Sequence, residues 1–143
     1  MRILVVDDHE PVRAGICALL ATDSAFTVCG EARDGYDAFE KAKELHPDIV
    51  LMDVTMPVMN GLVATRQIKQ LLPKTIIIIV TQHDAREMMR QALDAGAAAY
   101  IVKSRIAIDL FGAIEKVISE SKQFSPATPS AGTALPLPVI LSQ

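Results

Sequence analysis

Acidic, hydroxyl and amine side chains directly follow short apolar runs at four points of the chain. In chain order these side chains are Asp7 and Asp8, Asp53, Thr81 and Lys103. Three carboxylates brought together would raise one another's pKa unless a cation lies among them. A hard divalent ion with oxygen ligands would relieve this repulsion. Mg²⁺ fits best because it accepts one or two carboxylates, a carbonyl and several waters.

Asp53 is the carboxylate that this set favours as a nucleophile. A metal ion and Lys103 beside its oxygens would suit an incoming phosphoryl group, whose charge spreads over three oxygens in the transition state. Attack would form an acyl phosphate, with Thr81 donating to one phosphoryl oxygen and Lys103 pairing with another. Singly, each residue has an ordinary alternative: a helix N-cap pair for Asp7 and Asp8, a loop cap, a buried hydroxyl and a solvated strand end. Their common position after apolar runs favours a shared site.

Strands and helices that alternate along the chain would bring these residues together. Apolar runs predict strands at 2–6, 26–32, 49–52, 75–80 and 98–102. Apolar residues at helical spacing predict helices at 9–20, 36–45, 61–72, 84–95 and from Ser104 onward. Such alternation requires parallel strands joined by right-handed crossovers, which makes a doubly wound three-layer α/β fold. The carboxyl ends of its strands meet at one edge of the sheet.

Composition indicates one globular domain followed by a tail of different character. The 143 residues are 50% hydrophobic and 22% charged, which suits a domain with a substantial core. We expect the domain to span residues 1–122. Residues 123–143 hold four of the eight prolines and are expected to form a flexible tail or part of a linker. The alternative for the apolar stretch LPLPVIL is docking on a surface groove.

Charge and hydropathy argue against nucleic-acid binding and membrane insertion. The formal net charge is -3 and no dense Lys/Arg cluster occurs, so direct DNA binding by this chain is not expected. The sequence has no signal-peptide pattern and no apolar run of transmembrane length, which predicts a soluble, cytoplasmic protein. Cys17 and Cys29 lie in apolar segments and are expected to be small core residues rather than a disulfide or metal pair.

Four stretches together resemble the receiver domains of two-component response regulators. They are ILVVDD, LMDVTMPVMNG, IIIVT and AGAAAYIVKS, and the similarity covers about Met1 to Ser121. The resemblance implies a flavodoxin-like, CheY-like fold with five parallel strands in the order 2-1-3-4-5 and five helices. It also implies transfer of a phosphoryl group to Asp53 from a sensor histidine kinase or a phosphotransfer protein. AYIVKS resembles the NarL/FixJ-like subfamily, whose members carry a helix-turn-helix output domain and regulate transcription.

The resemblance implies a metal-binding role for four residues. Asp8 and Asp53 would bind Mg²⁺, or Mn²⁺, directly. Asp7 would contribute mostly through water, and the Thr55 backbone carbonyl would be a further ligand. Such a protein is a signalling phosphoacceptor and not an enzyme, because it catalyses only its own phosphotransfer and autodephosphorylation.

The resemblance also implies a switch and two residues that tune its lifetime. Thr81 and Tyr100 match the switch pair, which would remodel the face built from the fourth helix, fifth strand and fifth helix. The ordinary alternative for Tyr100 is a half-buried strand aromatic. Thr55 and His83 match positions that set how fast water removes the phosphoryl group. Homodimerisation on phosphorylation is a further expectation.

The sequence departs from the family pattern at Ser104, since many receivers have proline after the lysine. The sequence leaves open whether the chain is a stand-alone receiver or part of a DNA-binding regulator. The sequence fits three rival functions less well. A haloacid-dehalogenase-type phosphatase would need a second aspartate where Thr55 stands. A flavodoxin-like electron carrier would need a phosphate-binding loop after the first strand, where Asp7 and Asp8 would instead repel the phosphate of a flavin. A pseudo-receiver that acts only through binding is disfavoured by the complete acceptor site.

Overall fold

The computed structural model describes residues 1–54, 56, 59–82, 86–123 and 139–140, and their side chains up to residue 121. The strands are β1 (Arg2–Val6), β2 (Thr27–Ala32), β3 (Ile49–Asp53), β4 (Ile76–Thr81), β5 (Ala99–Val102) and β6 (Val139–Ile140). The helices are α1 (Glu10–Leu20), α2 (Gly35–Leu45), α3 (Gly61–Leu71), α4 (Arg86–Ala95) and α5 (Ile106–Gln123), with a 3-10 turn, η1 (Lys103–Arg105), before α5.

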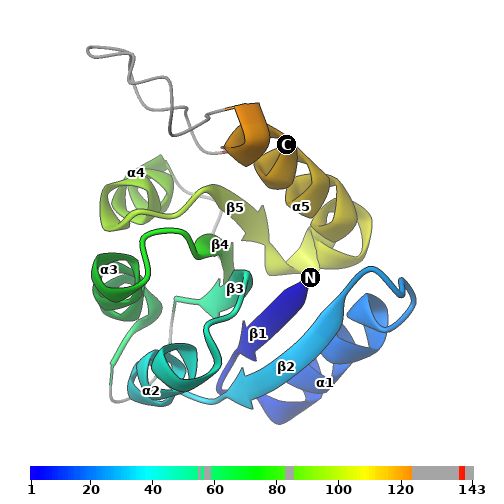
Figure 1. The fold of residues 1–143 in the computed structure, drawn as a ribbon, viewed down its shortest axis with the longest axis horizontal. Helices are drawn as coiled ribbons and strands as arrows, with labels where there is room; N and C mark the ends of the chain where they lie inside the picture. Colours follow the sequence, from blue (N-terminus) through cyan, green and yellow to red (C-terminus); the bar gives the residue numbers. More distant parts are fainter. Residues whose placement is uncertain (55, 57–58, 83–85, 124–138, 141–143) are drawn as a thin grey trace.

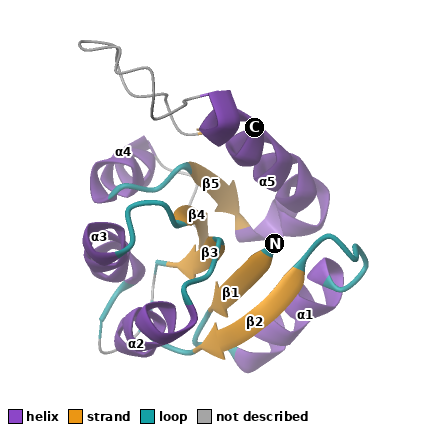
Figure 2. Cartoon of the chain, viewed as in Figure 1, coloured by secondary structure: helices purple, strands orange, loops and turns teal. Residues whose placement is uncertain are grey.

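The sheet is parallel, and its first five strands lie in the order β2-β1-β3-β4-β5. Helices α1 and α5 cover one face, and α2, α3 and α4 cover the other (Figures 1 and 2). This confirms the predicted doubly wound three-layer fold and its strand order. Each predicted strand and helix is present, and where the ends are described they differ from the prediction by at most two residues.

The core consists of two apolar layers, one on each face of the sheet. Alternate strand residues point to opposite faces, so Leu4 packs with the α2–α4 layer and Ile3 packs with the α1–α5 layer. All five residues of β3 are buried. The apolar run of β3 is unbroken because a central parallel strand is covered by helices on both faces.

Local capping explains where several helices begin and end. The Asn60 side chain accepts hydrogen bonds from the main-chain N–H groups of Leu62 and Val63, which fixes the start of α3. Gly96 follows α4 with φ of 106°, a conformation that favours glycine at a helix end. Asp84, where this helix is predicted to begin, lies outside the described residues.

Strand β6 was not predicted from the sequence. Val139 and Ile140 pair in parallel with Ala99 and Tyr100, so β6 lies at the outer edge of β5. These two residues belong to the segment that was expected to be a flexible tail. Their pairing uses main-chain groups, which any sequence without proline at those positions can provide, so composition alone gave no signal for it.

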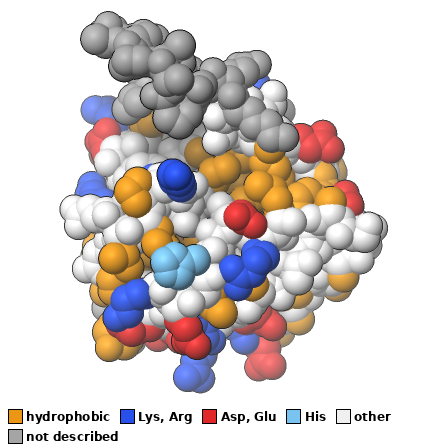
Figure 3. Space-filling view, viewed as in Figure 1, with side chains coloured by type: hydrophobic (Ala, Val, Ile, Leu, Met, Phe, Trp, Pro, Cys, Tyr) orange, Lys and Arg blue, Asp and Glu red, His pale blue; other side chains and the backbone are white. Residues whose placement is uncertain are grey.

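Charged side chains are dispersed over the visible surface. On the face drawn in Figure 3, basic side chains lie singly among acidic and uncharged ones, apart from the area covered by grey atoms. Among the described helices, none is both long and apolar enough to span a membrane. Cys17 and Cys29 are free and only partly buried. Cys17 packs against the α1–α5 layer as expected, whereas Cys29 belongs to neither core layer.

Gly61 fixes how closely α3 approaches the carboxyl end of β3. A Cβ atom at this position would lie 1.9 Å from the main-chain oxygen of Asp53, and the Gly61 N–H donates to the Val54 carbonyl at 3.0 Å. Backbone cannot move aside as the tip of a flexible side chain can. Any larger residue at Gly61 must therefore displace either α3 or the end of β3.

Gly61→Ala is expected to lower the free energy of unfolding by about 2–4 kcal/mol, because the added methyl group overpacks the β3 end. Urea denaturation measures this. The matched control is Gly15→Ala in α1, where nothing lies within 4 Å of the added Cβ. That control should gain about 0.5–1 kcal/mol. Equal stability of Gly61→Ala and wild type would contradict the close approach.

Candidate functional site

The carboxyl end of β1 supplies two aspartates in different surroundings. Asp7 is 1% exposed, whereas Asp8 is exposed. The Asp7 N–H donates to the Ala32 carbonyl at 3.0 Å, and its Oδ1 accepts from the His9 N–H at 2.8 Å. The turn after β1 thus buries one carboxylate and leaves its neighbour facing solvent.

Lys103 joins the ends of β1, β3 and β5. Its Nζ lies 2.9 Å from Asp7 Oδ2 and 3.3 Å from Asp53 Oδ1. Asp53, at the end of β3, is 3% exposed. The structure therefore brings together residues from positions 7, 53 and 103, as parallel strands predict.

Burial and the nearby negative charge of Asp7 disfavour the ionised form of Asp53. The pKa of Asp53 is raised to about 6, mainly by burial and next by the negative charge of Asp7. Lys103 acts in the opposite direction but does not cancel these effects. For Lys103 itself, burial lowers the pKa, yet the hydrogen bond to Asp7 and the charges of Asp53 and Asp7 outweigh burial and raise it.

The three aspartates fit a divalent cation. One carboxylate oxygen from each of Asp7, Asp8 and Asp53 can be chosen so that all lie within 4.8 Å of one another. Asp7 Oδ2 is buried, and its contact among the described residues is the ion pair with Lys103 Nζ at 2.9 Å. One ammonium group for three carboxylates leaves net negative charge, which a hard cation with oxygen ligands would neutralise.

The strand register places Thr81 beside this cluster. Asp53 is level with Val80 on β4, so Thr81 lies one position further toward the same edge, and Thr81 is level with Val102, which precedes Lys103. Thr81 is buried. Tyr100, the other expected switch residue, is 1% exposed in the α2–α4 layer, so it is more buried than the half-buried aromatic considered as an alternative.

Two expected site residues cannot be placed. Thr55 and His83 lie outside the described residues, and the metal-ligand and lifetime roles expected of them stay predictions. Ser104, which departs from the family pattern, lies in η1. The peptide bond between Lys103 and Ser104 is trans.

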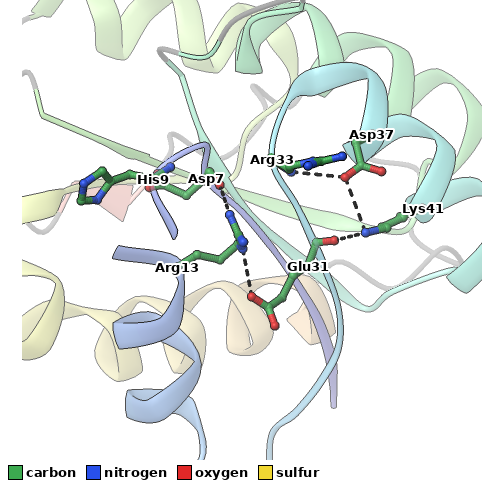
Figure 4. Close-up of polar contacts among 7 residues, drawn as sticks. All are labelled: Asp7, His9, Arg13, Glu31, Arg33, Asp37 and Lys41. Carbon is green, nitrogen blue, oxygen red and sulfur yellow. Dashed lines mark hydrogen bonds and ion pairs between the residues drawn. The ribbon is translucent and has the colours of Figure 1, made fainter. Parts of the chain in front are cut away.

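Sequence reasoning missed Arg13, which touches the site turn from α1. Its Nη1 donates to the main-chain oxygen of Asp7 at 2.7 Å, and its Nε lies 2.9 Å from Glu31 Oε1 on β2 (Figure 4). A basic residue on an amphipathic helix normally indicates only a solvated face. The sequence therefore held no signal that separated Arg13 from other surface arginines.

The raised pKa of Asp53 predicts how Asp53→Asn changes stability without divalent ions. Between about pH 4 and pH 6 the folded wild type holds more protons than the unfolded chain, so its stability falls as pH rises. Asparagine lacks this penalty. The variant should therefore gain little at pH 4.5 and on the order of 2 kcal/mol at pH 7.5, measured by urea denaturation.

The control for this prediction is the exposed Asp94→Asn in α4. Its stability relative to wild type should not grow in the same way over this pH range. A gain for Asp53→Asn that is equal at both pH values, or larger at pH 4.5, would contradict the electrostatic account of the cluster.

Comparisons with known proteins show which domains this chain resembles. Residues 3–115 match the response regulator receiver domain. The chain is 42% identical over 124 residues to the response regulator protein VraR of Staphylococcus saprophyticus, and the match covers 87% of this chain and 59% of VraR. The chain thus spans about three fifths of that relative's length.

Two solved structures extend the likeness to the fold. A LuxR-family two-component response regulator from Aurantimonas superposes with a TM-score of 0.79 and 38% identity, covering 83% of this chain and 85% of the other. The receiver domain of a putative NarL regulator from Mycobacterium tuberculosis superposes with a TM-score of 0.75 and 32% identity, covering 85% of this chain and 95% of the other. The chain belongs to the response regulator receiver family and is a two-component receiver domain of the NarL/LuxR-like type.

Proposed function

We propose that Asp53 accepts a phosphoryl group from the phosphohistidine of a sensor histidine kinase or phosphotransfer protein. The observation that carries the proposal is the sharing of Lys103 by two buried carboxylates, at 2.9 Å from Asp7 and 3.3 Å from Asp53. Uncompensated negative charge in a buried site lowers the stability of the fold. This charge would bind a cation, and the cation together with Lys103 would suit an incoming phosphoryl group.

The transfer makes one bond and breaks one bond. A carboxylate oxygen of Asp53 attacks phosphorus, the P–N bond to histidine breaks with its electron pair left on nitrogen, and an aspartyl phosphate results. Lys103 pairs with a phosphoryl oxygen, and the Thr81 hydroxyl donates to another. Asp8, Asp53 and the Thr55 carbonyl would hold Mg²⁺ or Mn²⁺, with Asp7 acting through water. The ion would neutralise charge on the phosphoryl oxygens.

The proposed readout is a change in the surface formed by α4, β5 and α5. Thr81 and Tyr100 lie on the adjacent strands β4 and β5, so a hydroxyl drawn to the phosphoryl group would alter packing next to the tyrosine. Tyr100 is buried against the layer that includes Ala92 of α4. Repacking at Tyr100 would therefore change how α4 packs on the sheet.

Activities of a longer protein are proposals that rest on its relatives. The chain covers 59% of its VraR relative, and the LuxR-type likeness suggests control of transcription through an output domain or partner. We propose that this chain itself acts as a signalling phosphoacceptor in the cytoplasm, is not an enzyme acting on other substrates, and does not contact nucleic acid or membrane directly.

Incubation with acetyl phosphate and Mg²⁺ tests phosphoacceptance. Intact-mass spectrometry should detect one added phosphoryl group on the wild type and none on Asp53→Asn, because only the aspartate can form the acyl phosphate. No adduct should form when a chelator removes Mg²⁺ before acetyl phosphate is added. Asp94→Asn is the matched control and should be phosphorylated like wild type.

An unmodified wild type would contradict the proposal and favour the alternative of a pseudo-receiver that acts by binding alone. An adduct that persists in Asp53→Asn would place the acceptor elsewhere. Changed phosphoryl lifetimes in Thr55 or His83 variants, followed in the same assay, would support their tuning role, and unchanged decay in both would remove it.

Homodimerisation on phosphorylation is proposed from family likeness through the α4–β5–α5 surface. Beryllofluoride, which mimics the phosphoryl group on aspartate, should shift the protein to earlier elution on a size-exclusion column. Asp53→Asn should elute unchanged under the same conditions. Identical elution of the wild type with and without beryllofluoride would contradict a dimer.

A further inference from the structure

The turn between β1 and α1 carries Asp7 and Asp8, and the N-cap residue of α1 does not stabilise this turn through its side chain. His9 is the N-cap of α1, and its side chain makes no capping hydrogen bond. Within the turn, Asp7 Oδ1 accepts from the His9 N–H at 2.8 Å. The main-chain carbonyl of Asp7, by contrast, accepts a hydrogen bond from a group outside the turn.

Arg13 supplies that group. Its Nη1 donates to the Asp7 carbonyl at 2.7 Å, and its Nε donates to Glu31 Oε1 at 2.9 Å. The Arg13 side chain is 14% exposed and that of Glu31 is 49% exposed. The guanidinium therefore links the metal-ligand turn to β2 with two bonds from one rigid, planar group, which a lysine cannot reproduce.

Glu31 is itself held in place from α2. Lys41 donates to the Glu31 main-chain oxygen and lies 3.5 Å from an Asp37 carboxylate oxygen (Figure 4). The chain of contacts thus runs from α2 through β2 and Arg13 to the carbonyl of Asp7. The side chains of this chain of contacts, from Arg13 to Lys41, line one cleft between α1, β2 and α2.

We propose that Arg13 is a positioning residue that holds the Asp7–Asp8 turn in the conformation that binds Mg²⁺. The inference rests on the proposed function and deepens it. Arg13 does not touch the metal or the phosphoryl group. It acts through the main-chain oxygen of Asp7, as partners of metal ligands do when they orient a coordination site.

The charge of Arg13 and its positioning role predict opposite changes in Mg²⁺ affinity when Arg13 is removed. If Arg13 were only a nearby positive charge, its removal would make the site more negative and would tighten Mg²⁺ binding. If Arg13 positions the turn, its removal loosens the convergence of the three carboxylates and weakens binding. The sign of the change in Mg²⁺ dissociation constant therefore separates the two roles.

The test is Mg²⁺ titration by isothermal calorimetry of four full-length chains: wild type, Arg13→Gln, Arg13→Lys and Arg33→Gln. Arg13→Gln should bind Mg²⁺ at least about tenfold more weakly. Arg33 lines the same cleft, so Arg33→Gln removes the same charge and should bind as tightly as wild type or more tightly. Arg13→Lys keeps the charge without the fork and should bind more weakly than wild type.

A second readout needs no metal. In the metal-free protein, the His9 amide hydrogen should exchange about tenfold faster in Arg13→Gln than in wild type, because its acceptor Asp7 is no longer held. The Ala21 amide, bonded to Cys17 at the far end of α1, should exchange as in wild type. Equal acceleration at both amides would show general loosening of α1 and overturn the proposal.

These results also separate failure of this inference from failure of the proposed function. A wild type that binds no Mg²⁺ would overturn the proposed metal-dependent phosphoacceptance, while exchange at His9 would still decide the role of Arg13. A wild type that binds Mg²⁺, with unchanged or tighter binding by Arg13→Gln, would overturn the positioning role alone. If Arg13→Gln does not fold, Arg13→Lys decides by the same measurements.

Discussion

Lys103 holds two buried carboxylates together at the carboxyl edge of the sheet, and the rest of the site depends on this electrostatic balance. One ammonium group faces Asp7 and Asp53, with Asp8 close by. Burial strengthens both the attraction to Lys103 and the repulsion between the carboxylates, because the effective dielectric constant is lower there. The metal-free site is therefore held together but not neutral, and it favours the binding of further positive charge.

The fold makes this balance possible by fixing main-chain positions rather than side chains. β3 is buried along its whole length, and α3 packs so closely on its end that only glycine fits at position 61. Directly after β1, the Asp7 main chain is held by hydrogen bonds to Ala32 and Arg13. Rigid elements thus present carboxylates from distant parts of the sequence to one point. Such preorganisation spares the site the cost of assembling charge during the reaction.

The architecture and the convergence of the acidic site with Lys103 could be predicted because both follow from periodicity and from the geometry of parallel sheets. Finer features could not. The sequence does not separate Asp7 from Asp8, yet one is buried and the other exposed, since a one-residue difference at a strand end decides which side chain turns inward. Arg13 was missed because a long, flexible side chain can reach many partners. β6 was missed because strand pairing at an edge needs only main-chain groups.

The most direct test of this account is the titration of the Asp53 side-chain carboxyl carbon by NMR, with and without Mg²⁺. The account predicts a pKa of about 6 in the metal-free protein, because burial and Asp7 disfavour the charged form. It predicts a clear decrease when Mg²⁺ is added, because a cation stabilises that form. A pKa near the ordinary value of about 4 in the metal-free protein, or no response to Mg²⁺, would contradict it.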